Sequence, residues 1–95
     1  MTTDDDDSAL PGGDGSPPLD FATLVLSLSG SCMIQLGEFA GPEGHLAVDL
    51  PSARNTLEML LLLESKTRGN LTGEEERVLS HVVNDLRGRY VAKLR

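Results

Sequence analysis

Apolar residues recur at helical spacing in three stretches of the chain, and turn-forming residues separate these stretches. The first stretch follows Asp20, whose side chain suits a helix N-cap, and ends before Gly37, which suits the residue after a helix. At about 100° per residue, its apolar positions share one broad face. These positions are Phe21, Leu24, Val25, Leu28, Cys32 and Leu36. The pattern predicts a helix at residues 21–36.

The second stretch follows Asp49, another suitable N-cap, and has Pro51 in its first turn, where a missing N–H does no harm. With Gly69 as its end, it predicts a helix at about residues 50–68. Its apolar positions cover an arc of about 200°, against the stripe of about 100° that is typical of a surface helix. They are Ala53, Leu57, Met59, Leu60, Leu61 and Leu63. Leu62 adds an apolar residue to the otherwise polar side.

The third stretch opens with a capping box, in which Thr72 and Glu75 bond to each other's backbone N–H groups. It predicts a helix at residues 73–93, with acidic side chains early and basic side chains late, as the helix dipole favours. Its apolar face consists of Val78, Leu79, Val82, Val83, Leu86, Tyr90 and Leu94. The fold class is therefore all-α, a three-helix bundle that self-association completes.

The segment between the first two predicted helices, residues 37–48, is long for a helical bundle. A turn is predicted at its centre, where Gly41, Pro42 and Gly44 occur together. The residues after this turn are expected to run extended and to lay Leu46 and Val48 on the core.

Residues 1–18 combine four consecutive aspartates with a proline- and glycine-rich stretch, a composition typical of disorder. We predict a disordered acidic tail here and a single helical domain at residues 19–95. Most of the net charge of −7 belongs to this tail, since residues 1–20 hold six acids and no base. The tail serves solubility or, as an alternative, acts as an acidic docking arm.

Composition excludes several classes of protein. One cysteine cannot form an internal disulfide, and the acidic N-terminus does not resemble a signal peptide. Residues 21–37 are uncharged and nearly long enough to span a membrane. Their serines and Gln35, without flanking bases or an aromatic belt, favour a helix outside the membrane.

Residues that could perform catalysis or bind metal are few and isolated. Cys32 lies on an apolar helix face, where burial raises the pKa of a thiol and makes it unreactive. His45 and His81 have no ligand-type neighbours at metal-binding spacing, and the three glutamates after Gly73 are explained by helix capping. We therefore predict no enzymatic activity, no cofactor and no metal.

Two surfaces remain as candidate interaction sites. The uncharged first helix and the wide apolar arc of the second predict self-association as a homodimer. Its candidate residues are Ser27, Gly30, Ser31, Leu60, Leu61 and Leu62. The end of the third helix forms a candidate patch for an anionic partner. This patch consists of Arg87, Arg89, Tyr90, Lys93 and Arg95.

Four strings, at residues 20–28, 36–38, 66–76 and 85–90, are similar to the small bacterial family known as domain of unknown function 1844. The resemblance covers residues 20–91 and is thinnest at residues 41–48. The Lys-Thr-x-Gly-Asn-Leu-Thr and Asp-Leu-Arg-x-Arg-Tyr strings are its most specific parts. The resemblance implies a bacterial cytoplasmic protein, and the family has no assigned activity to carry over.

The functional prediction is a small, non-enzymatic helical interaction or adaptor module that acts as a homo-oligomer and also binds an unknown protein. The alternative is a regulator that binds nucleic acid or an acidic partner through the basic end of the third helix.

Overall fold

A computed structural model describes residues 19–95 of the chain. Its helices are α1 (Phe21–Gln35), α2 (Leu50–Lys66) and α3 (Gly73–Lys93), and the described residues contain no strand. The predicted all-α fold is thus confirmed. The predicted disordered tail, residues 1–18, lies outside the described residues.

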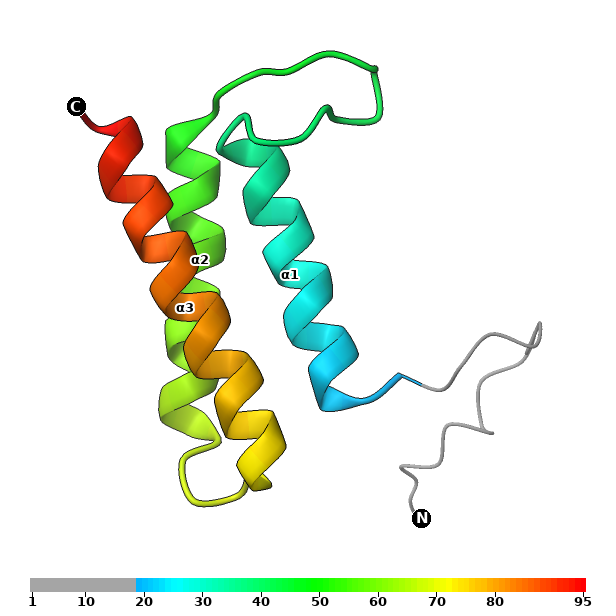
Figure 1. Cartoon of the computed structure of the whole chain (residues 1–95), viewed down its shortest axis with the longest axis vertical. Coiled ribbons are helices and arrows are strands. Elements are labelled where there is room, and N and C mark those ends of the chain that lie inside the picture. Colours follow the sequence, from blue (N-terminus) through cyan, green and yellow to red (C-terminus); the bar gives the residue numbers. More distant parts are fainter. Residues whose placement is uncertain (1–18) are drawn as a thin grey trace.

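The three helices form a bundle in which each helix packs against the other two. In Figure 1, α1 and α3 run from the lower to the upper end of the bundle, and α2 runs in the opposite direction. The core is aliphatic and receives side chains from all three helices. Its buried members are Val25, Cys32, Leu36, Ala53, Leu57, Leu60, Leu79, Val82, Val83 and Leu86.

Both predicted aspartate caps are present. The Asp20 carboxylate accepts a hydrogen bond from the Thr23 backbone N–H at 2.8 Å, and Asp49 accepts from the Ser52 N–H at 3.2 Å and its hydroxyl at 2.7 Å. These bonds favour the charged carboxylates, so the pKa of each aspartate is lowered. Gly37 has φ +80°, the left-handed conformation expected of it.

α2 ends at Lys66, two residues earlier than the predicted 68. The Thr67 hydroxyl donates to the Leu63 carbonyl at 2.6 Å, a local bond that competes with helix continuation. The Asn70 N–H then bonds to the Thr67 carbonyl at 2.8 Å and closes the turn. Gly69 has φ +87°, as predicted, so the glycine lies within the turn and not directly after the helix.

The predicted capping box begins α3. The Glu75 N–H donates to the Thr72 hydroxyl at 3.1 Å, and the Glu75 carboxylate accepts from the Thr72 N–H at 2.8 Å. α3 then runs over residues 73–93, as predicted.

We expect Thr72→Ala to lower the free energy of unfolding by about 1 kcal/mol, because one of the orphan N–H groups of the first turn loses its partner. Urea denaturation measures this change. Ser80→Ala, at an exposed site within α3 and away from its cap, is the control. An equal loss in both variants would contradict the capping role.

The segment between α1 and α2 differs from the prediction. Leu46 and Val48 do not lie on the core and are 62% and 56% exposed. The Asp49 N–H donates to the Gln35 carbonyl at 2.7 Å and ties the segment's end to the end of α1. Leu36 is buried at this end of the bundle and Leu50 packs against the core, so the core is closed here without Leu46 and Val48.

Candidate functional site

One surface with exposed apolar residues is formed by the outer sides of α1 and α2. We define the α1–α2 face as Leu24, Ser27 and Ser31 of α1 with Met59 and Leu62 of α2. All five side chains are exposed, and Leu62 is 58% exposed. At about 100° per residue, the three α1 positions lie on the side of the helix nearer α2. The prediction that Leu62 lies off the core face is confirmed.

Leu60 was expected in the self-association surface, and this assignment is wrong. Its side chain is fully buried, as part of the core to which all three helices contribute. Leu61 is half-buried against the same core. Leu62 lies on the opposite side of α2 from Leu60, because residues two apart on a helix differ by about 200°. Only Leu62 of the three leucines is therefore free for a large surface contact.

The small residues of α1 line the outside of that helix. Ser27 and Ser31 are exposed, and Gly30 is half-buried. A Cβ atom added at Gly30 would meet nothing within 4 Å, so no neighbouring element of the described chain requires a glycine here. The absence of bulk leaves this side of α1 open to close approach by another helix.

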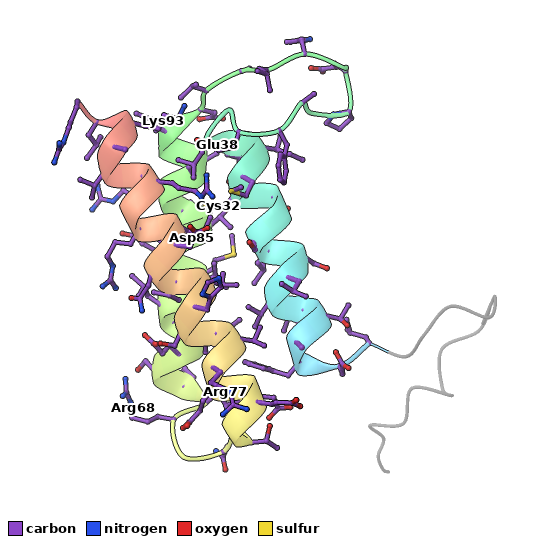
Figure 2. The ribbon with its side chains drawn as sticks, in the orientation of Figure 1. Cys32, Glu38, Arg68, Arg77, Asp85 and Lys93 are labelled. Atoms are coloured by element: carbon purple, nitrogen blue, oxygen red, sulfur yellow. The ribbon has the colours of Figure 1, made fainter. Side chains whose placement is uncertain are left out.

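Two of the four bases at the end of α3 form ion pairs within the bundle. Arg89 Nη1 lies 3.2 Å from Glu38 Oε1, and Lys93 Nζ lies 3.6 Å from Glu38 Oε2. Arg89 Nε also donates to Asp85 Oδ2 at 2.9 Å, a bond that raises the pKa of Arg89 above its ordinary value. Figure 2 shows Glu38 and Lys93 at the same end of the bundle. Two of the four predicted bases thus fasten α3 to the end of α1.

Glu38 was not among the residues singled out from the sequence. It follows Gly37, whose left-handed conformation turns the chain toward α3. The sequence signal was a carboxylate immediately after a helix stop, which by itself does not identify a partner 51 residues away. The pairing became visible only when the topology placed the ends of α1 and α3 side by side.

The other side of the α3 end forms a notch with the beginning of α2. We define the α2–α3 notch as the open depression of about 490 Å³ lined by Leu50, Pro51, Arg54, Asn55, Glu58 and Tyr90. Tyr90 is half-buried and packs against the core, as predicted. Arg54 Nε lies 3.3 Å from Glu58 Oε2. Sequence reasoning found Tyr90 but not the α2 residues, because no spacing rule relates the two helices.

The interior holds two polar contacts between α1 and α2. The Cys32 thiol is fully buried 3.6 Å from the Ala53 carbonyl, and burial raises its pKa, as expected. The Thr56 hydroxyl donates to Gln35 Oε1 at 2.7 Å, which satisfies a buried polar group. Figure 2 shows Cys32 inside the bundle. A buried thiol of raised pKa suits a core position and not a nucleophile.

Residues 19–95 contain no group of three or more histidine, cysteine, aspartate or glutamate side chains placed to hold a metal ion. Within the same part of the chain, none of the helices has the length and apolar character needed to cross a membrane.

The strings that carry the family resemblance come together as structural contacts. Leu36 closes the core, and Glu38 pairs with Arg89 of the Asp-Leu-Arg-x-Arg-Tyr string. The Lys-Thr-x-Gly-Asn-Leu-Thr string forms the turn between α2 and α3. Arg87 and Gly88 remain outside this explanation, because both are exposed.

Comparison with known proteins identifies a family but no characterised relative. No curated protein and no solved structure matches the chain. The model of the family described as Domain of unknown function (DUF1844) matches residues 18–92. Because this match spans well over half of the sequence, the chain belongs to the DUF1844 family.

Proposed function

We propose that the protein is a small, non-enzymatic helical interaction module that acts as a homodimer in the cytoplasm and offers a further surface to an unknown protein. The exposure of Leu62 on the α1–α2 face carries this proposal. A free, buried Cys32 agrees with a reducing compartment.

The area of the α1–α2 face supports self-association. Leu24, Met59 and Leu62 are 36%, 42% and 58% exposed. Together with the small residues of α1, they offer a patch of several hundred Å², the size that marks interaction sites on soluble proteins. At about 25 cal/mol per Å², covering such a patch on two copies contributes several kcal/mol before association costs.

The charge pattern supports a second copy as the partner. The chain carries no charged residue from Phe21 through Gly37, so two α1 helices meet without electrostatic repulsion. An uncharged surface also suits the core of an interface, where charged residues are depleted because removing them from water is costly. A two-fold axis is the commonest symmetry for such a contact, since each patch then covers its identical counterpart.

We expect Leu62→Glu to shift the protein from dimer to monomer while leaving its helical content unchanged. The substitution places two carboxylates in the two-fold contact but disturbs no buried side chain, because Leu62 points away from the core. Sedimentation velocity at micromolar concentration measures the change. Leu94→Glu is a matched control, because Leu94 is also 58% exposed but lies outside the α1–α2 face.

A wild-type protein that sediments as a monomer would overturn self-association. If both variants sediment like a wild-type dimer, self-association stands, but the α1–α2 face is refuted as the contact. A dimer that Leu94→Glu dissociates and Leu62→Glu does not would place the contact at the end of α3 and refute the α1–α2 face.

A second candidate function is a regulator that binds an anionic partner through the end of α3. Within the described residues, neither Arg87 nor Arg95 forms an ion pair, unlike Arg89 and Lys93. The end of α3 therefore offers a partner two unpaired bases, fewer than the four that the sequence indicates. Binding to a DNA duplex that weakens steeply with added salt would support this function, since it reports the release of counterions from phosphates.

A further inference from the structure

The α2–α3 notch continues into an exposed strip of α3. Arg87, Tyr90, Val91 and Leu94 have the spacing i, i+3, i+4 and i+7, which places them on one side of the helix. Tyr90 contributes to the notch itself, while Val91 and Leu94 are 44% and 58% exposed. The surface therefore combines an aromatic ring, exposed aliphatic groups and an unpaired guanidinium.

We propose that the α2–α3 notch, with the adjoining strip Arg87, Val91 and Leu94, is a docking site for the acidic segment of this same chain at residues 4–10. The segment reads Asp4-Asp5-Asp6-Asp7-Ser8-Ala9-Leu10. Its carboxylates face the basic groups, and Leu10 covers the apolar part. This contact is independent of the proposed self-association, because Leu62 is not part of the notch.

Charge complementarity is the first argument for this occupant. Residues 1–20 carry six acids and no base, so the segment has no internal counter-charge. At the end of α3, Arg87 and Arg95 are exposed, and neither forms an ion pair within residues 19–95. Arginine is well suited to such contacts, since its guanidinium donates two parallel hydrogen bonds to one carboxylate.

The alternative basic positions are less suitable. Arg68 and Arg77 lie at the opposite end of the bundle from Lys93, as Figure 2 shows. That end also carries Glu74, Glu75 and Glu76 in the first turn of α3. These three carboxylates repel an aspartate run and cancel the attraction of the two arginines. At the far end of α3, Glu38 and Asp85 are paired with Arg89 and Lys93, which leaves Arg87 and Arg95 to attract the segment.

The length of chain permits the contact. α1, whose first residue follows Leu19 by two positions, begins at the end of the bundle where α3 begins (Figure 1), and the notch is near the other end. α2 spans the bundle with 17 residues, or about 26 Å at the rise of an α-helix. Eight residues lie between Leu10 and Leu19, and the nine Cα-to-Cα steps of this extended chain reach about 30 Å. Covalent attachment also keeps the segment at a high effective concentration near the notch.

A docked segment would regulate the end of α3. While it occupies the notch, Arg87 is neutralised and the apolar strip is covered, so an external anionic partner has to displace it. The docked segment thus weakens the binding of an anionic partner, which is the second candidate function. High salt or a competing partner releases the segment and removes this inhibition.

The experiment compares the full-length wild-type chain with the full-length variant D4N/D5N/D6N/D7N. Tyr90 is the only tyrosine, and the chain has no tryptophan, so ultraviolet-excited emission reports the notch directly. Amide NMR peaks of Arg87, Val91 and Leu94 give a second readout. At about 0.01 M salt we expect the two chains to differ in both readouts. At about 1 M salt, where the Debye length is about 3 Å, we expect the differences to vanish.

Added peptide then identifies the occupant. A synthetic peptide of residues 1–18 should restore the wild-type spectrum to the asparagine variant in a saturable way. Arg87→Gln in that background should weaken peptide binding about two- to fivefold, as expected for loss of an exposed ion pair. Arg77→Gln, which removes an equal charge at the other end of α3, should leave binding unchanged and is the matched control.

Three results would overturn the proposal. In the first, wild type and the asparagine variant have the same Tyr90 emission and the same NMR peaks at low salt. In the second, Arg77→Gln weakens the peptide as much as Arg87→Gln, which would indicate only a non-specific field. In the third, an acidic peptide of scrambled sequence binds as tightly as residues 1–18, which would make the notch a general site for acidic partners.

Discussion

Leu60→Ala is expected to lower the free energy of unfolding by about 2–5 kcal/mol, the range found when a fully buried leucine is truncated. The Leu60 side chain is completely excluded from solvent and belongs to the core cluster to which all three helices contribute. Removing it loses the transfer free energy of its methyl groups and leaves a cavity that the surrounding helices fill only partly. Small domains have little stability in reserve, so the variant should be close to unfolding at room temperature.

Leu62→Ala provides the matched control for this experiment. It makes the same chemical change in the same helix, but at a side chain that is 58% exposed. At a protein concentration low enough to keep the chain monomeric, we expect a change within about 0.5 kcal/mol. Urea denaturation followed by circular dichroism measures both variants. If Leu62→Ala cost as much as Leu60→Ala under these conditions, the assignment of the inner and outer sides of α2 would be wrong.

Gly37→Ala should have the second-largest effect, at about 2–3 kcal/mol. Gly37 has φ +80°, and an L-residue in this conformation costs about 1–2 kcal/mol. A Cβ atom there would also lie 2.7 Å from Val48 Cγ2, so Val48 and the end of the connecting segment would have to move. That movement adds about 1 kcal/mol of overpacking. It also strains the turn that directs Glu38 toward Arg89 and Lys93.

Gly44→Ala separates the two contributions. Gly44 has φ +86°, nearly the same conformation as Gly37, but a Cβ atom added there would meet nothing within 4 Å. The backbone cost is therefore shared by the two variants, and the packing cost belongs to Gly37 alone. Equal losses of stability in urea denaturation would show that the contact with Val48 carries no energy.

Local structure was predictable because it depends on residues close together in the sequence. Asp20, Asp49 and Thr72 begin helices through hydrogen bonds to N–H groups three residues away. Gly37 and Gly69 adopt the left-handed conformation that their positions after apolar stretches indicated. Helical spacing likewise placed Leu62 on the outer side of α2 and Cys32 in the core.

Errors occurred where several structures satisfied the same local pattern. Leu46 and Val48 have the alternation of a packed extended segment, but Leu36 and Leu50 close that end of the core without them. α2 ends before residue 68, where the Asn70 N–H bonds to the Thr67 carbonyl and closes a turn, a choice that residue preferences do not reveal. Leu60 belongs to an apolar arc of about 200°, and the sequence did not show how much of this arc the neighbouring helices would cover.

The candidate surfaces also combine features that the local sequence predicts with features that depend on tertiary packing. The sequence alone determined the three helices, their caps, the aliphatic core and the acidic character of residues 1–20, because composition and short-range hydrogen bonds fix these features. Only the tertiary structure decided that Glu38 neutralises Arg89 and Lys93, and that Tyr90 forms a notch with Leu50, Pro51 and Arg54. Both arrangements join residues more than thirty positions apart, and the packing of α1 and α2 on α3 determines which distant side chains meet.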